Sequence, residues 1–178
     1  MYLVSILGES AGVVTEAIEW LRKNGVKDRI RSIVLYSRNV KEEVKVLRKV
    51  LKDKRVKDRL GNVEVKFINI GINDIEKESD IKKFEKNVKR ILRSIKKEED
   101  IIVNISGGRK MMVILLLELI KGRKVKWINI VSYLPREKIA ELGSVIREKI
   151  DAGIRLDDEE INSYFFSDGK YKVFYFPK

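Results

Sequence analysis

The stretch "DIIVNISGGRKMMVILLLELI", residues 100–120, joins a short apolar run to a long one through two glycines and two cations. Residues 100–106 are short and rich in β-branched side chains, which is typical of a buried strand, whereas 109–122 has the length of a helix. A strand that passes directly into a helix is the repeating unit of parallel α/β sheets. We therefore expect an α/β protein with an unusual loop at residues 106–110.

The same alternation of strand and helix runs through most of the chain. Strand-like runs lie at 2–7, 32–37, 63–70, 100–106 and 125–134, and helical patterns at 13–24, 40–57, 79–97, 109–122 and 136–150. Strict alternation with β-branched strands predicts a parallel sheet covered by helices on both faces. Because crossovers between parallel strands are right-handed, we expect a doubly wound, Rossmann-like domain over residues 1–150.

The tail has a different pattern. After Arg155 comes "LDDEEINSYFFSDGKYKVFYF", in which "SDGK" separates two aromatic-rich runs. This pattern predicts an antiparallel β-hairpin that turns at Asp168 and Gly169. Residues 151–178 would then form a hairpin appendage of the same structural unit, and the acidic run 157–160 is interpreted as a solvated turn rather than a metal site.

Composition excludes several kinds of chemistry. The 178 residues include no cysteine and no histidine. This excludes disulfides, thiol nucleophiles and zinc ribbons, as well as imidazole acid–base chemistry and histidine metal sites. We expect no cofactor and no metal. No apolar run is long enough to span a bilayer, and Met1 begins on a strand-like segment without a signal peptide, so we expect a cytoplasmic protein with no membrane partner.

The net charge of +12 and the pI near 9.7 have two interpretations. One is a polyanionic partner, such as a nucleic acid or a nucleotide. The other is a heat-adapted surface rich in lysine and glutamate. In 79–97 the apolar residues keep helical spacing, so the Lys and Arg residues between them belong to the solvated face. Charge alone therefore leaves both interpretations open.

Two loops stand out as a candidate ligand site. Open α/β sheets bind ligands beyond the carboxyl ends of the strands, where the strand order reverses. A strand order of 3-2-1-4-5 would place the first and fourth strands side by side at this reversal. The loop "GESAG", residues 8–12, would then face the loop "SGGRK", residues 106–110, across one crevice.

The residue types in these loops are suited to a phosphate ligand. Glycines let the backbone approach a ligand closely, and the free N–H groups at a helix start attract phosphate. Arg109 and Lys110 add fixed positive charge, while Ser10 and Ser106 offer hydroxyls. Alternatively, "SGGRK" is only a tight turn capped by Ser106. Neither G-x-x-x-x-G-K-[ST] nor G-x-G-x-x-G after the first strand occurs, so an ordinary P-loop ATPase or a dinucleotide oxidoreductase is not expected.

At these loops the sequence resembles a known family. "SILGESAGVVTEAI" (5–18) resembles the first motif of CRISPR-associated Rossmann fold (CARF) domains, and "NISGGRKMM" (104–112) resembles the second. The resemblance implies a homodimer that binds cyclic oligoadenylate across its two-fold axis. HEPN ribonuclease effectors need a histidine, and the residues after 150 are too few for a winged helix-turn-helix. What remains resembles the stand-alone CRISPR ring nucleases, which linearise cyclic tetra-adenylate and switch off type III immunity.

This resemblance also assigns roles to residues. It implies that Ser10, Arg109 and Lys110 are catalytic. The chain has Glu9-Ser10-Ala11 where many relatives have Thr-Ser-Pro, and Arg109 where many have Thr or Ser. Arg109 is the variant that fits the ring-nuclease subgroup.

Further ligand-binding residues are expected in both loops and at the ends of neighbouring strands. They are Gly8, Glu9, Ala11, Gly12, Tyr36, Asn104, Ser106, Gly107, Gly108 and Tyr133. Asn104 either holds its loop or touches the ligand. Tyr36 and Tyr133 either stack on adenine or pack against the core or its rim. Thr15 and Glu16 are expected to cap and solvate the first predicted helix.

Three functions remain open. The first is a metal-independent ring nuclease, in which a ribose 2′-OH attacks its own 3′-phosphate and leaves linear di-adenylate with a 2′,3′-cyclic phosphate. Such an enzyme would be slow, because it lacks a strong general base. The second is a sensor that binds cyclic oligoadenylate and acts through a partner. The third, a generic nucleic-acid binder, rests on charge alone and predicts steep salt dependence with any RNA. We expect no stable DNA or long RNA partner.

Overall fold

In the computed structural model, which describes residues 1–176, one sheet has the strand order β3-β2-β1-β4-β5-β6. The strands are β1 (Tyr2–Leu7), β2 (Ile30–Tyr36), β3 (Val63–Asn69), β4 (Ile101–Asn104), β5 (Val125–Ser132) and β6 (Tyr171–Phe176). The pairings among β1 to β5 are parallel, and β6 pairs antiparallel with β5. The predicted order 3-2-1-4-5 and the doubly wound α/β fold are confirmed.

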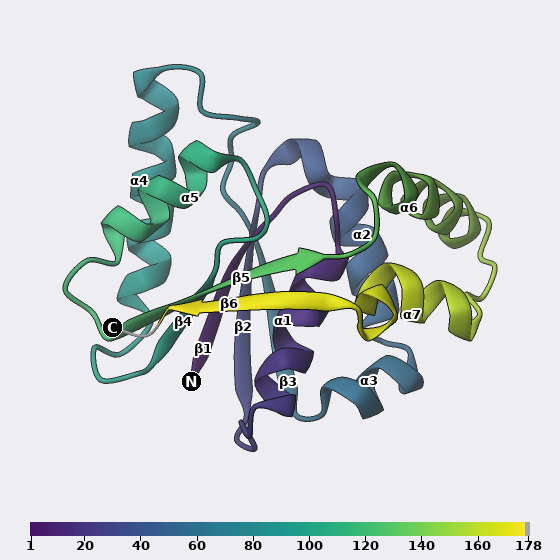
Figure 1. Ribbon diagram of the computed structural model, residues 1–178. Helices are drawn as coiled ribbons and strands as arrows, with labels where there is room; N and C mark the ends of the chain where they lie inside the picture. The colour runs from purple at the N-terminus through teal and green to yellow at the C-terminus, as the bar shows by residue number, and fades with distance from the viewer. Residues whose placement is uncertain (177–178) are drawn as a thin grey trace.

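Helices cover both faces of this sheet (Figure 1). One face carries α4 (Glu78–Arg93) and α5 (Lys110–Leu119). The other carries α1 (Gly12–Lys23), α2 (Lys41–Val50), α3 (Lys54–Leu60), α6 (Arg136–Asp151) and α7 (Asp158–Phe166). Two short 3-10 turns, η1 (Arg38–Val40) and η2 (Ser167–Gly169), complete the described elements.

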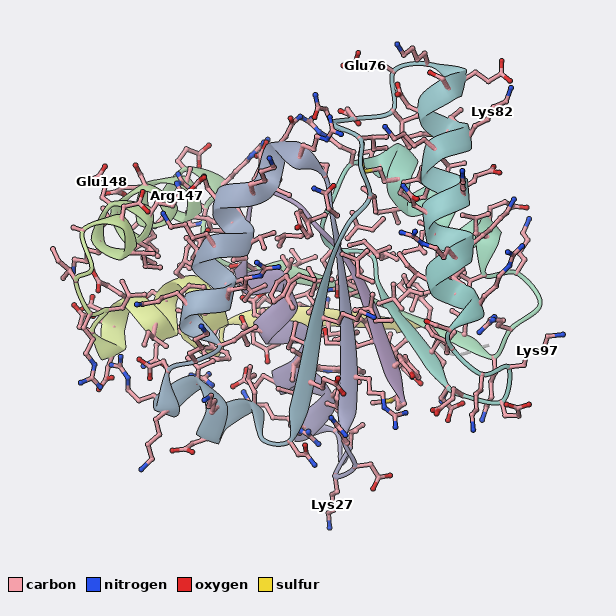
Figure 2. All side chains as sticks on the ribbon, turned by 180° about the vertical axis from the view of Figure 1, so that it is seen from behind. Lys27, Glu76, Lys82, Lys97, Arg147 and Glu148 are labelled. Carbon is pink, nitrogen blue, oxygen red and sulfur yellow. The ribbon has the colours of Figure 1, made fainter. Side chains whose placement is uncertain are left out.

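The core consists of two apolar layers, one on each side of the sheet. Successive side chains of a strand point to opposite faces. Leu3 and Leu7 of β1 therefore enter the layer under α1, whereas Val4 and Ile6 enter the layer under α4 and α5. Charged side chains of the helices and loops point outward, as the labelled Lys27, Lys82 and Lys97 do in Figure 2. Burial on both faces explains why the central strands are apolar runs without alternation.

The single helix predicted over residues 40–57 is wrong, because the chain forms two helices there. After Val50 the chain turns, and Asp53 begins α3 by accepting a hydrogen bond from the Arg55 N–H at 2.9 Å. Aspartate is a favoured N-cap because its carboxylate satisfies a free N–H of the first turn. The apolar spacing continues across this break, so periodicity alone did not show it.

The predicted C-terminal hairpin is also wrong. Residues 158–166 form α7, and the strand that follows pairs with β5 rather than with the tail itself. Asp157 accepts from the Glu160 N–H at 2.8 Å, and the Glu160 carboxylate accepts from the Asp157 N–H at 3.0 Å. This reciprocal capping box starts a helix. A turn is present at Asp168 and Gly169 as expected, and both residues have a positive φ, but it joins a helix to a strand. Residues 177 and 178 of the predicted appendage lie outside the described residues.

None of the helices in the described part of the chain is long and apolar enough to cross a membrane.

Candidate functional site

A crevice of about 560 Å³ lies beyond the carboxyl ends of β1 and β4. Both predicted loops line it, the first with Gly8, Glu9 and Ser10 and the second with Ser106, Gly107, Gly108 and Arg109. The sheet reverses its order between β1 and β4, which is where open α/β sheets bind ligands. Two segments far apart in the sequence thus form the walls of one crevice.

The glycines allow the two loops to meet backbone to backbone. A Cβ atom on Gly107 would lie 2.4 Å from the Ile6 carbonyl oxygen, and one on Gly8 would lie 2.8 Å from the Gly108 nitrogen. Gly108 also has a φ of +77°, a conformation that side chains disfavour. Glycine is therefore required here by the contact between the loops, whatever ligand the crevice takes.

Asn104 and Ser106 tie the elements around the crevice together. The Asn104 side-chain amide donates to the Val13 carbonyl at 2.8 Å, and its oxygen accepts from the Ser106 N–H at 3.0 Å and the Ser106 hydroxyl at 2.6 Å. The Ser106 hydroxyl in turn accepts from the Ile130 N–H at 2.6 Å. Ser106 still lines the crevice, whereas Asn104 is buried beneath it and holds the two loops in register.

Three arginines line the crevice, and a carboxylate holds each of them. The pairs are Arg109 with Asp74 (3.2 Å), Arg136 with Glu9 (3.4 Å) and Arg147 with Glu43 (3.2 Å). Arg109 precedes the first turn of α5, where unpaired N–H groups favour an anion. The Arg136–Glu9 pair is exposed, and exposed pairs contribute little stability, so an incoming phosphate can replace Glu9 as the partner of Arg136 at small cost. The Arg147–Glu43 pair is partly buried.

Besides Asn104, five predicted site residues do not line this crevice. Lys110 is the exposed first residue of α5 and lies just outside. Ala11 is fully buried, and Gly12 packs so closely on α7 that a Cβ would lie 2.4 Å from the Tyr164 carbonyl oxygen. Tyr36 lines a separate groove beside α2, because its side chain projects from the sheet face that α2 covers. Tyr133 follows β5, is 67% exposed and lines none of the crevice.

Sequence reasoning missed several residues of this crevice. Asn39 and Asn73 lie in the connections after β2 and β3, at the same edge of the sheet, and Arg136 opens the helix after β5. The rule that led to the two glycine loops applies equally to these connections and could have found all three residues. Arg147 lies near the end of α6, where the sequence carries no signal for it.

A buried polar network lies behind the first loop, and it contradicts the expectation that Thr15 and Glu16 are solvated. Both side chains are buried, because the C-terminal segment covers this face of α1. The Thr15 hydroxyl contacts the Phe165 carbonyl, and the Ser167 hydroxyl donates to Glu16 at 2.5 Å. Burial raises the pKa of Glu16 to about 7, although the hydrogen bond from Ser167 opposes this shift.

The acidic run 157–160 has a structural role, since Asp157 and Glu160 cap α7. Among residues 1–176, no three acidic side chains come together as a metal-binding cluster would require.

The fold and the crevice define a doubly wound α/β protein with an arginine-lined ligand site where its strand order reverses. The family model of the CRISPR-associated protein NE0113 matches residues 10–121, which is well over half of the chain and includes most of both loops. The chain belongs to this family of CRISPR-associated proteins. The family expected from the two motifs, a CRISPR-associated protein of Rossmann-like fold, is thereby confirmed.

Two solved structures are similar to this chain at low sequence identity. Csm6 from Enterococcus italicus, bound to cyclic hexa-2'-fluoro-hexa-dAMP, aligns with a TM-score of 0.53 at 15% identity, over 85% of this chain and 38% of its own. Can2 from Sulfobacillus thermosulfidooxidans, in complex with cyclic tetra-adenylate, gives a TM-score of 0.46 at 16% identity, over 72% of this chain and 31% of its own. The chain spans less than half the length of either protein. No curated protein matches it in sequence.

Proposed function

We propose that this protein is a ring nuclease that binds cyclic tetra-adenylate across a homodimer and cleaves it without a metal ion. The products would be linear di-adenylates with 2′,3′-cyclic phosphates, and their formation would end type III CRISPR signalling. One observation carries the proposal. Two glycine loops that are distant in sequence meet at the reversal of the sheet and present Ser10 and Arg109 to one crevice.

The comparisons support the ligand class in this proposal. The family is CRISPR-associated, and the Csm6 that shares the fold was solved with a cyclic oligonucleotide of adenine. A cyclic oligoadenylate presents phosphates that arginine grips bidentately. Arg109, Arg136 and Arg147 supply three such side chains in one protomer.

The proposed chemistry needs positioning and charge stabilisation. The ribose 2′-oxygen attacks the adjacent phosphorus, the bond from phosphorus to the 5′-oxygen breaks, and the 2′-OH proton passes to the leaving 5′-oxygen. Arg109 and Lys110 would stabilise the charge that develops on the phosphoryl oxygens, and Ser10 would orient the 2′-OH or a non-bridging oxygen. The rate would be low, because no imidazole is present to act as base.

A homodimer would complete the site, and α5 offers the surface for it. This helix is apolar on nearly every side, yet Met111 is 48% exposed and Ile114 is 59% exposed. A helix that is apolar all round is normally covered. Lys110 lies one residue before Met111. A partner docked on α5 would bring the Lys110 side chains of both protomers near the ligand, and this would account for the position of Lys110 outside the crevice of one protomer.

A second candidate function is a sensor that binds the ring without cleaving it. The observation that favours it is that each lining arginine is already held by a carboxylate. Among the described residues, the two carboxylates that line the crevice, Glu9 and Glu43, are both paired with arginines. A site of this kind can bind phosphates while contributing little to proton transfer.

The deciding experiment incubates the purified protein with cyclic tetra-adenylate in EDTA and separates the products by liquid chromatography–mass spectrometry. We expect linear di-adenylate with a cyclic phosphate. Its rate of formation should fall at least ~100-fold in Ser10→Ala and in Arg109→Ala, since each removes a group that stabilises the transition state. Arg93→Ala, which removes an exposed arginine of α4 far from the crevice, should leave the rate unchanged.

Each other outcome has a definite meaning. An intact ring that binds wild type and is released by Arg109→Ala would establish the sensor. A ring that is neither bound nor cleaved would reject the proposed ligand class.

A further inference from the structure

A row of cations on α2 forms a second charged surface, distinct from the crevice. It consists of Lys41, Lys45, Arg48 and Lys49 of α2, continued by Lys52 in the turn after the helix and by Lys57 of α3, and we call it the α2 strip. Residues three, four, seven and eight positions apart share one side of a helix. From Lys41 to Lys49 the strip runs about 12 Å along α2 at the rise of an α-helix.

The α2 strip borders two adjoining grooves that contain no carboxylate. The groove at Tyr36 measures about 480 Å³, the groove along β3 measures about 540 Å³, and Arg48 and Lys52 line both. Among the described residues, Lys45 is the one member of the strip with an acidic partner, Asp151. The strip therefore concentrates positive charge instead of neutralising it.

The lysines of helix α4 have a different arrangement. Lys82 pairs with Glu78 at 2.6 Å and Lys89 pairs with Glu85 at 3.1 Å, so acidic side chains interrupt the lysines of α4. Lys82 points to solvent in Figure 2. Arg90 of α4 also lines a groove, but that groove contains the carboxylate of Glu64. Among the described residues, no carboxylate lines either groove of the α2 strip.

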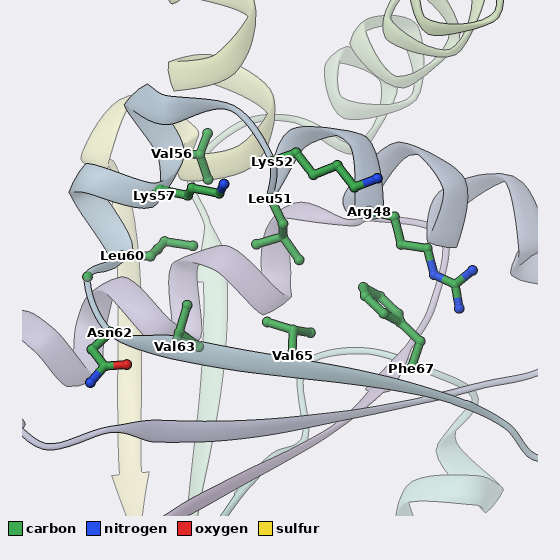
Figure 3. Close-up of a pocket in the computed structure, with 11 residues that line it drawn as sticks. Arg48, Leu51, Lys52, Val56, Lys57, Leu60, Asn62, Val63, Val65 and Phe67 are labelled. Carbon is green, nitrogen blue, oxygen red and sulfur yellow. The ribbon is translucent and has the colours of Figure 1, made fainter.

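The grooves also offer flat and apolar surfaces. The Arg48 guanidinium lies over the Phe67 ring, 5.0 Å from its centroid, and both side chains line the groove along β3 (Figure 3). A guanidinium plane backed by a ring is a platform on which a nucleobase can stack. Val63 and Val65 form an apolar floor beside this platform, and Tyr36 supplies a second ring at the other groove.

The α2 strip leads away from the candidate ligand crevice. Val40 and Glu43, at the start of α2, line the crevice, and Lys41 and Val44 line the first groove of the strip. An extended anion could therefore follow α2 outward from the edge of the crevice.

We propose that the α2 strip binds a short single-stranded nucleic acid, with phosphates on the cations and one base stacked on Arg48. A single strand fits because its bases are free to stack, whereas a duplex hides them. An acidic protein would use the cations but would leave the platform unused. The proposal does not depend on the ring-nuclease reaction, and a weak, salt-dependent contact is compatible with the expectation of no stable long RNA partner.

The test measures fluorescence anisotropy of a 5′-labelled linear octa-adenylate RNA at 50 and 200 mM KCl. The strip variant is Lys45→Glu with Lys49→Glu. The control is Lys82→Glu with Lys86→Glu, the same spacing on α4, and each pair contains one lysine with an acidic partner. We expect binding to weaken at least ~10-fold in the strip variant. Its salt slope should become shallower by about 1.4, because each lost phosphate contact on a single strand removes about 0.7. The control should bind like wild type.

Several results would overturn the proposal. They are absence of binding at 50 mM KCl, equal weakening in both double variants, and competition by poly-glutamate as effective as that by unlabelled RNA. Loss of binding in Arg109→Ala with retention in the strip variant would place the RNA in the crevice instead. Circular dichroism melts of all variants would exclude unfolding as the cause of weaker binding.

Arg48→Lys keeps the charge but removes the planar platform. This variant should therefore weaken RNA binding without changing the salt slope.

Discussion

Among single residues, Glu16 has the most unusual environment. It is a carboxyl group on α1, buried under the C-terminal segment, with the Ser167 hydroxyl as its hydrogen-bond donor. Its neighbour Glu19 differs. Burial opposes ionisation of Glu19 too, but hydrogen bonds from Tyr171, Arg59 and Lys23 outweigh this effect and lower its pKa. Glu16 has no cation of this kind, so burial prevails and its pKa is about 7.

The raised pKa of Glu16 predicts a specific pH dependence of stability. Between pH 4.5, its ordinary value, and about 7, the unfolded chain has lost the proton while the folded protein keeps it. Stability from this group is therefore complete below that window and falls as pH rises through it, by about 3 kcal/mol in total.

Glu16→Gln should remove this dependence while keeping the acceptor for Ser167. Urea unfolding gives the free energy of unfolding of wild type and of Glu16→Gln at pH 5 and at pH 8. We expect the wild type to lose more stability than the variant between these two pH values. An equal loss in both proteins would show that Glu16 does not titrate in this window.

Among the elements, α7 is the main reason that the observed tail differs from the predicted hairpin. It packs Phe165 and Phe166 into the core under α1, and β6 then extends the sheet beside β5 (Figure 1). The capping box of Asp157 and Glu160 decides where this helix starts. The C-terminal segment also borders the first loop, because Gly12 rests on Tyr164.

Asp157→Ala should therefore destabilise the protein by about 1 kcal/mol, the usual contribution of a helix N-cap. For a chain of this length the melting temperature should fall by about 3 °C. Differential scanning calorimetry measures the shift, and Glu159→Ala in the same acidic run is the control because Glu159 makes no capping contact. Equal shifts in both variants would show that general charge, and not the cap, is responsible.

For the whole molecule, the proposed dimer through α5 is the feature that decides whether the site is complete. Ile114→Glu places a charge in the middle of the exposed apolar face of α5 and should yield a monomer of 20.8 kDa. Light scattering coupled to size exclusion measures the mass, and ring binding should be lost with the dimer. Ile154→Glu is the matched control, since Ile154 is also more than half exposed but lies after α6. A dimer that survives Ile114→Glu would assign the interface to another surface.

The architecture of residues 1–134 and the location of the crevice could be read from sequence because their signals are local. Strand and helix patterns follow side-chain periodicity within each segment, and the strand order 3-2-1-4-5 then brings loops 8–12 and 106–110 together. The capping box before α7 was a local signal as well, but the aromatic alternation around "SDGK" outweighed it in the prediction. The break at Asp53 was hidden because apolar spacing runs through it.

The chain's own pattern thus determined the order of its elements along the chain and marked the two unusual loops, since both depend on neighbours along the chain. That the two loops meet depends on the strand order of the sheet. Only the tertiary structure decided which side chains line the crevice. Arg136 and Arg147 line it, whereas Lys110 and Tyr36 do not. It also decided that Asn104 and Glu16 are buried. These outcomes depend on contacts between distant segments, and Glu16 and Ser167, for example, are more than a hundred residues apart. Burial and the direction of a side chain are set by what packs against it, and no local pattern records that.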